Sequence, residues 1–365
     1  AACHGLRNQR KGFCEKHNTM TRPNLFRFAT SELSQDAFLC WLASWADAKY
    51  KNRDPELRRL AERLLTHLVV AATEGTAAPA VSVPDFGKVV ARRQVGKIDV
   101  AIEIGEKLVL VIEDKTDTSD HSDQLSRYKK TAAAEWPDRE LAFVYLKTGN
   151  QSSFKRVNDR GWGKVSRSDL LDILAAGRGT IANPIFLDFL DHLVLLENET
   201  QAYQHIKGPY IKDKDAAWGG WEGRAWQGFF MAIEARLGES DWGYVPNATG
   251  GFMGFWWCFS DVEDTSEGIQ LYLQLSGPQL TVKLHVPAMD RRRALRDEWW
   301  KDLDMNPALK RVGLGRPKRL GLGQYMTVAS KDEYRIWGPN GLLDLDATVA
   351  SLVEIAQIKT QLVTD

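Results

Sequence analysis

Apolar side chains recur along the first half of the chain with the spacings of helices and of strands. Spacings of three and four residues predict amphipathic helices, and short unbroken apolar runs predict buried strands. In chain order, we predict helices over 33–48 and 55–73, an extended segment over 81–94, strands over 97–104 and 108–115, a helix over 120–134, strands over 141–147 and 164–167, and helices over 169–176 and 182–204. This order predicts an α/β or α+β core.

The second half of the chain differs in composition and predicts a separate domain. Nine of the 13 tryptophans lie between Trp218 and Trp337. The predicted elements are a helix over 221–237, strands over 251–259, 269–275 and 280–286, a helix over 289–303, a strand over 325–329 and a helix over 345–362. We therefore predict a first domain over 23–205, a polar linker over 206–217, and an α+β domain with an antiparallel sheet over 218–365.

The composition excludes several classes of protein but does not indicate a particular binding partner. Lys plus Arg equals Asp plus Glu, at 48 each, so net charge gives no bias toward nucleic acid. No apolar run is long enough to cross a bilayer, so we predict no membrane association. Four cysteines are too few for a disulfide framework, and the first residues lack the apolar stretch of a signal peptide. A cytoplasmic location is predicted.

The first residues contain a group of zinc-binding residue types. Cys3, His4, Cys14 and His17 lie close together in the sequence. Their spacing is not that of a known zinc finger, and no apolar core accompanies them. We therefore favour a disordered extension over residues 1–22.

The strands over 97–104 and 108–115 predict a hairpin with a defined register. With a loop at 105–107, apolar residues face one another across the pair on a continuous apolar face, which a shift of one residue would destroy. The same register places Asp99 directly opposite Glu113. Lys115 lies two residues after Glu113 and points to the same side, whereas Asp114 points to the other.

This arrangement of charges indicates a metal-assisted site. Two carboxylates directly opposite each other destabilise a bare sheet. A hard divalent cation relieves the repulsion, because Mg²⁺ is held by one or two carboxylates together with waters and substrate phosphate. A lysine beside such an ion can activate a water and stabilise charge on a phosphate. The alternative is a solvated strand end with an ordinary salt bridge between Glu113 and Lys115.

The hairpin contains Asp99, thirteen intervening residues and then Glu113-Asp114-Lys115. This pattern resembles the catalytic signature of the PD-(D/E)XK nuclease superfamily. The predicted order of elements from about residue 30 to 147 is also similar to the core of that superfamily. The resemblance implies a restriction-endonuclease-like core, with a mixed sheet flanked by helices. One departure is that Ile98, instead of proline, precedes Asp99.

The following helix extends the resemblance. Gln124 and Tyr128 form the Q-x-x-x-Y pattern that marks an exonuclease-like branch of the superfamily. The resemblance implies that Lys115 positions the attacking water, that Gln124 holds the lysine or the water, and that Tyr128 touches a phosphate. Arg127 lies beside this set and could bind phosphate, although a solvated helix arginine is the alternative.

The resemblance also implies a metal site. Asp99 and Glu113 would bind Mg²⁺, with Mn²⁺ as a substitute, together with the backbone carbonyl of Asp114. Glu32, on the first predicted helix, is the candidate for a further metal contact.

A basic segment stands out in the neutral chain. Residues 291–320 carry ten Lys or Arg against four acids. Arg316, Lys318 and Arg319 lie in a Gly-rich loop and are candidates for contacts to phosphates. The alternative is a solvated helix face and loop. The dense aromatic residues over 242–257 could stack unpaired bases, but a domain core is favoured.

The prediction is therefore a Mg²⁺-dependent nuclease that hydrolyses phosphodiester bonds in DNA, in bacterial restriction or anti-phage defence. The alternative is a non-catalytic nucleic-acid-binding or interaction module on the same fold. The sequence leaves RNA open as a substrate and allows a homo-oligomer.

Overall fold

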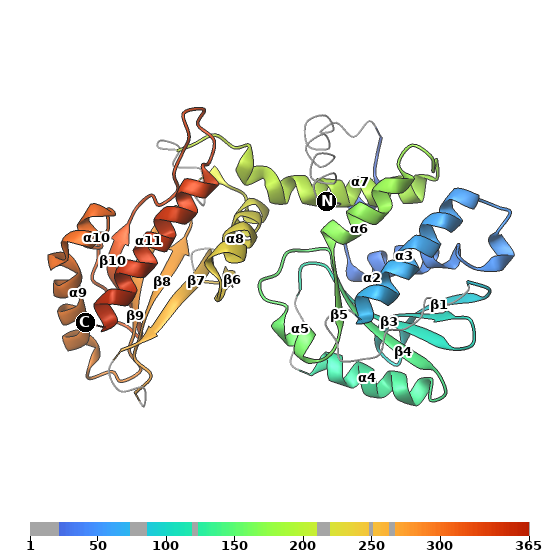
Figure 1. Ribbon diagram of the computed structural model, residues 1–365, viewed down its shortest axis with the longest axis horizontal. Coiled ribbons are helices and arrows are strands. Elements are labelled where there is room, and N and C mark those ends of the chain that lie inside the picture. The colour runs from blue at the N-terminus through green and yellow to red at the C-terminus, as the bar shows by residue number, and fades with distance from the viewer. Residues whose placement is uncertain are drawn as a thin grey trace. The chain divides into compact units, whose positions relative to one another are not determined.

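The computed structural model describes residues 22–73, 86–118, 123–209, 220–247, 251–262 and 267–364. The chain forms two compact units, one ending at Asn198 and one beginning at Glu199, and each contains one five-stranded sheet (Figure 1). The division falls within helix α7 (Pro184–Gln201), ahead of the predicted domain end at 205. Residues 1–21 of the predicted extension and 210–217 of the predicted linker lie outside the described residues.

Unit 1 is built on a mixed sheet, called sheet A below. Its strands are β1 (Val89–Val95), β2 (Ile98–Ile104), β3 (Leu108–Lys115), β4 (Glu140–Lys147) and β5 (Gly163–Ser166), in the order β1-β2-β3-β4-β5. The first three strands form an antiparallel meander, whereas β4 runs parallel to β3 and β5 parallel to β4. The predicted hairpin register is confirmed, because Val100 pairs with Ile112, Ile102 with Leu110 and Ile104 with Leu108.

Helices cover both faces of this sheet. The apolar core on one face includes residues of α2 (Glu32–Ser44), α3 (Pro55–Thr73), α6 (Arg167–Leu174) and α7. A smaller core on the other face includes residues of α4 (Gln124–Glu135) and α5 (Lys155–Asp159). Figure 1 shows α4 and α5 on the side of the strands opposite α2, α3 and α6. Among the described residues there are also four short 3-10 turns: η1 (Leu25–Arg27), η2 (Ala48–Tyr50), η3 (Ala175–Gly177) and η4 (Ala202–Gln204).

Strand β3 lies at the centre of the sheet, and all eight of its residues are buried. Because β3 and β4 run parallel, their carboxyl ends meet at the same edge of the sheet. The antiparallel strand β2 begins at that edge. The fold therefore brings the start of β2 and the ends of β3 and β4 to one place.

Unit 2 is built on an antiparallel sheet. Its strands are β6 (Ser240–Val245), β7 (Phe252–Asp261), β8 (Gln270–Ser276), β9 (Gln279–His285) and β10 (Tyr325–Lys331), in the order β10-β9-β8-β7-β6. Its helices are α8 (Gly223–Leu237), α9 (Arg292–Met305), α10 (Pro307–Arg311) and α11 (Leu345–Thr364). These helices and the strands share one apolar core. The predicted α+β domain with an antiparallel sheet is confirmed.

Apart from the 3-10 turns, two α-helices and one strand of the described residues were not predicted. Helices α5 and α10 have five residues each, too few to show a helical period. Strand β6 is short and contains Gly243, and it forms because β7 pairs with it.

Of the six aromatic residues over 242–257 that were considered as base-stacking groups, three are core residues, whereas Tyr244 is exposed. Phe255 and Trp257 are buried in the apolar core, and Trp242 lies directly across from Phe255 in the sheet. Within the described residues, no helix is both long and apolar enough to span a bilayer.

Candidate active site

The predicted carboxylates lie together at the shared edge of sheet A. Asp99 is the second residue of β2 and directly precedes Val100, the first residue of β2 that pairs with β3. The backbone N–H of Asp114 donates to Asp99 Oδ2 at 3.2 Å. This hydrogen bond ties the start of β2 to the end of β3 and places the Asp99 carboxylate beside Glu113.

Glu113 is fully buried and poorly satisfied. Its Oε2 atom has no hydrogen-bond partner in the described part of the chain. Burial raises the pKa of Glu113 to about 8, and the negative charge of Asp99 adds to the shift. The contact with Lys115 acts in the opposite direction but is the weaker influence.

The Lys115 ammonium lies near three oxygen acceptors. Its Nζ forms an ion pair with Glu113 Oε1, donates to the carbonyl of Asp114 at 3.3 Å and lies 3.9 Å from Glu32 Oε2. Burial lowers the pKa of Lys115, but the hydrogen bond and charge of Glu113 outweigh burial and raise it. Lys115 is therefore an ammonium held against the carboxylates, as the predicted register requires.

Glu32, at the first turn of α2, reaches the same edge. Its Oε1 atom accepts hydrogen bonds from Thr116 N at 3.2 Å and from Thr118 Oγ1 at 2.6 Å. The other oxygen faces Lys115. The structure thus places Glu32 beside the ammonium and the segment that follows β3.

Gln124 and Tyr128 lie one turn apart on α4 and contact each other. Gln124 Nε2 donates to the Tyr128 hydroxyl at 2.9 Å. Burial raises the pKa of Tyr128, and the charges of Glu113 and Asp99 raise it further. The two residues of the Q-x-x-x-Y pattern therefore belong to the same electrostatic environment as the carboxylates.

Two buried residues of α2 were missed from the sequence. Gln35 Nε2 donates to Asp114 Oδ1, and Gln35 Oε1 accepts from Thr148 Oγ1 at 2.7 Å. Asp36 is also buried and interacts with the Asp114 carboxyl. Burial, followed by the charge of Asp99, raises the pKa of Asp36 to about 6. Its spacing of four residues from Glu32 was the available signal, because such residues share a helix face.

Lys147 was also missed. It ends β4 and is the direct neighbour of Lys115 across the parallel pair. Its Nζ is buried and donates to the carbonyl of Thr118, and burial lowers its pKa to about 8. A lysine that closes an otherwise apolar parallel strand was the signal, because such strands end at the edge that carries the site.

The candidate phosphate contacts have different surroundings. Arg127, on α4, is exposed. The other three lie in unit 2, in the loop before β10, and are also exposed. The Arg316 guanidinium lies 4.8 Å from the centre of the Trp300 ring, and Lys318 Nζ lies 2.9 Å from Asp332 Oδ2. Arg319 forms no ion pair within the described residues.

The donor set fits a cation that is completed by water and substrate. No three His, Cys, Asp or Glu side chains in the described ranges are grouped closely enough to hold a metal ion by themselves. Asp99 and Glu113 supply two carboxylates, and the buried Glu113 Oε2 accepts no hydrogen bond from the residues that the structure describes. An unsatisfied buried carboxylate oxygen is costly, and a divalent cation would satisfy it. Mg²⁺ commonly takes only one or two carboxylates from the protein.

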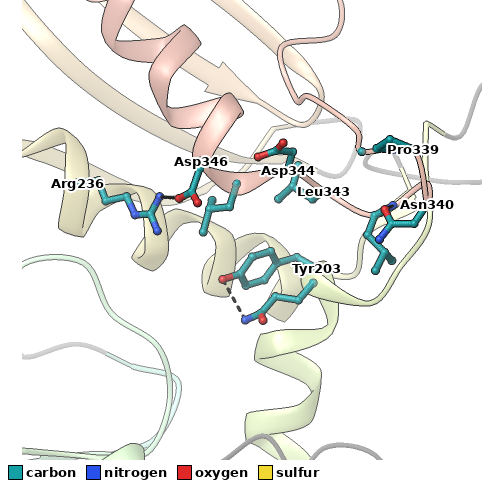
Figure 2. Close-up of a pocket in the computed structure, with 11 residues that line it drawn as sticks. Tyr203, Arg236, Pro339, Asn340, Leu343, Asp344 and Asp346 are labelled. Carbon is teal, nitrogen blue, oxygen red and sulfur yellow. Dashed lines mark hydrogen bonds and ion pairs between the residues drawn. The ribbon is translucent and has the colours of Figure 1, made fainter. Parts of the chain in front are cut away.

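A separate concavity lies in unit 2. Figure 2 shows its lining, which comes from η4, the end of α8 and residues 338–346, around a volume of about 680 Å³. Arg236 and Asp346, on its wall, form an ion pair at 2.5 Å. The Tyr203 hydroxyl accepts a hydrogen bond from Gln204 at 3.3 Å. None of the predicted site residues lines it.

Comparison with protein families matches residues 23–190 to the PD-(D/E)XK nuclease superfamily. Comparison with curated proteins found no match, and comparison with solved structures found none either. The matched residues include the whole of sheet A and the edge at which Asp99, Glu113 and Lys115 meet. The resemblance predicted from Asp99, Glu113 and Lys115 is therefore confirmed as a match to the PD-(D/E)XK nuclease superfamily over residues 23–190.

Proposed function

We propose that this protein is a metal-dependent nuclease that hydrolyses phosphodiester bonds in DNA. One observation carries the proposal. The carboxylates of Asp99 and Glu113 and the ammonium of Lys115 lie together at one edge of a sheet whose residues match a nuclease superfamily. A role in restriction or anti-phage defence is part of the proposal and rests on analogy with the PD-(D/E)XK nuclease superfamily.

In the proposed site, Asp99 and Glu113 hold Mg²⁺ or Mn²⁺ with the carbonyl of Asp114, and Glu32 adds a contact. Such a cation would supply charge stabilisation at the scissile phosphate and a bound water of lowered pKa. The surroundings support this assignment, because Glu113 has an unsatisfied buried oxygen beside Asp99.

The chain's own residues would orient the reacting groups. Lys115 Nζ, which lies between Glu113 and Glu32, positions the attacking water and stabilises negative charge that develops on the phosphate. Gln124 holds the Tyr128 hydroxyl, which contacts a phosphate oxygen. Arg127 is proposed as a further contact to the nucleic-acid backbone.

Cleavage by the wild-type protein is compared with cleavage by Lys115→Ala. Linear, circular and single-stranded DNA and an RNA are incubated with Mg²⁺, with Mn²⁺ and with EDTA. We expect the wild type to cut DNA only with metal, and we expect Lys115→Ala to lose cleavage while still binding metal and DNA. A melting curve for each protein checks that the variant is folded.

The outcomes separate the proposal from its alternative. A wild-type protein that binds DNA, takes up no Mg²⁺ by calorimetry and cuts nothing is a binding module on the same fold. Near-normal turnover by Lys115→Ala would remove this residue from the mechanism. Cleavage of RNA but not of DNA would change the proposed substrate and keep the proposed metal-dependent hydrolysis.

A further inference from the structure

The turn between β1 and β2 has an unusual backbone for its sequence. Val95 pairs with Ile98, so the turn has two residues, Gly96 and Lys97, with φ of +55° and +76°. A two-residue hairpin turn of this kind needs positive φ at both positions and usually places glycine at the second. Here the second position is a lysine, whose side chain disfavours the left-handed region.

Gln94, just before the turn, has a φ of +58°. Only three residues other than glycine have positive φ in the described ranges, and Gln94 and Lys97 are two of them. The next turn of the same meander differs, since Gly105 occupies its left-handed position and Lys107 has no positive φ. Unfavourable backbone conformations persist mainly where they serve a function, such as ligand contact.

Both residues flank the site. Gln94 Nε2 lies 3.4 Å from Asp99 Oδ1, and Lys97 precedes Asp99 by two residues. The turn also packs on α4, because a Cβ added at Gly96 would lie 2.6 Å from Thr131 Cγ2. Thr131 is one helical turn beyond Arg127. The end of β1 therefore contacts Asp99, and the turn packs on α4 one helical turn beyond Arg127.

Two cations beside the site have no ion-pair partner among the described residues. Lys97 and Arg127 are exposed, and neither forms an ion pair with another described residue. The nearby arginines of β1 differ: Arg92 pairs with Glu103 at 3.1 Å, and Arg93 donates to the carbonyl of Leu33 at 2.6 Å. Unpaired cations beside a carboxylate site attract an anionic backbone.

We propose that the β1–β2 turn is a substrate-binding element, in which the Lys97 ammonium contacts a phosphate of the nucleic-acid backbone beside Arg127. The inference rests on the proposed nuclease function. The left-handed backbone directs Lys97 outward at the edge that carries Asp99, and the protein tolerates an unfavourable conformation for this contact.

Lys97→Gly tests the proposal, with Lys107→Gly as the matched control at the other turn. Both variants are made in the full chain carrying Lys115→Ala, so that duplex DNA is bound with Mg²⁺ and is not cut. Fluorescence anisotropy gives Kd for two unrelated sequences at several salt concentrations. We expect Lys97→Gly to weaken binding of both sequences alike and to reduce the slope of log K against log salt by about one. Lys107→Gly should leave both quantities unchanged.

Thermal melting provides a second measurement, in which the two variants should change in opposite directions. Glycine adopts a positive φ without the steric cost that lysine has, so Lys97→Gly should melt at or above the temperature of its parent. Lys107 has no positive φ, so Lys107→Gly should melt below its parent. An unchanged Kd and salt slope for Lys97→Gly, in a protein whose wild type cuts DNA, would overturn this inference alone. A wild type that neither binds nor cuts nucleic acid would overturn the proposed function, and this inference with it.

Discussion

The central residue of the site is Glu113, whose carboxyl is buried beside a second carboxyl. Burial and the charge of Asp99 together raise its pKa to about 8, although Lys115 is in contact with it. The native state therefore binds more protons than the unfolded chain between pH about 4.5 and about 8. Stability falls with rising pH wherever the native state binds more protons, so the metal-free protein should lose stability across this window.

Replacing Asp99 by Asn should remove the repulsion and a ligand together. We expect Asp99→Asn to melt at or above the wild-type temperature in EDTA and to flatten the fall in melting temperature between pH about 4.5 and about 8. We also expect it to lose stabilisation by Mg²⁺ and to lose cleavage. Thermal melts at several pH values, with and without Mg²⁺, measure these effects.

The control lies on the same strand. Glu103 forms ordinary ion pairs with Arg92 at 3.1 Å and Arg139 at 3.3 Å, so Glu103→Gln should lower stability by about 1 kcal/mol or less and leave Mg²⁺ binding intact. If Asp99→Asn melts well below the wild type in EDTA and Mg²⁺ still stabilises it, Asp99 is a structural acid.

At the scale of elements, the site depends on how the chain leaves β3 and β4. Thr148 N donates to the carbonyl of Lys115 at 3.1 Å, and the backbone of Gly149 passes close to Thr116. A Cβ at Gly149 would lie 2.0 Å from the carbonyl oxygen of Thr116, so only glycine fits there. Thr116 N in turn binds Glu32, and the crossing therefore supports α2 as well as Lys115.

Gly149→Ala should push these two backbones apart. We expect a loss of about 1–3 kcal/mol in the free energy of unfolding, as for other overpacked sites, together with reduced cleavage. Denaturant titration and the DNA cleavage assay measure the two effects. Gly87→Ala is the control, because a Cβ at Gly87 meets nothing within 4 Å. Equal stability of Gly149→Ala and the wild type would show that the crossing adjusts freely.

At the scale of the whole molecule, the two units carry different kinds of candidate residue. Unit 1 holds the carboxylates, the ammonium and the family match, whereas unit 2 holds the basic loop. Within that loop, Lys318 already pairs with Asp332 and lowers the pKa of that carboxyl, and Arg316 lies over Trp300. A phosphate would therefore compete with partners inside unit 2.

If unit 2 binds the substrate, Arg316→Ala combined with Lys318→Ala should weaken DNA binding at all sequences. The salt dependence should flatten by roughly one unit of slope for each lost contact. Anisotropy titrations at several salt concentrations measure this. Arg236→Ala, which removes a cation already paired with Asp346, is the control and should leave the slope unchanged. An unchanged slope in the double variant would assign the loop to the solvated surface.

Sequence alone determined the parts of this protein that depend on local pattern. The apolar residues of β2 and β3 and the short loop between them defined the register of the pair, and the register defined which charges share a side. Helix α3, predicted over 55–73, has those bounds in the structure, because its leucines keep a helical period and Pro55 begins it. The antiparallel sheet of unit 2 followed from the order of its elements, whereas the mixed sheet of unit 1 was implied by the resemblance to the PD-(D/E)XK nuclease superfamily.

Only the tertiary structure decided which distant residues complete the site and how strongly they are perturbed. Gln35 reaches Asp114 across 79 positions of sequence, and Lys147 lies beside Lys115 because β4 pairs in parallel with β3. The raised pKa of Glu113 and the positive φ of Lys97 also appear only there. Periodicity specifies which face of an element is apolar, but burial, desolvation and turn geometry depend on what other segments place against that face.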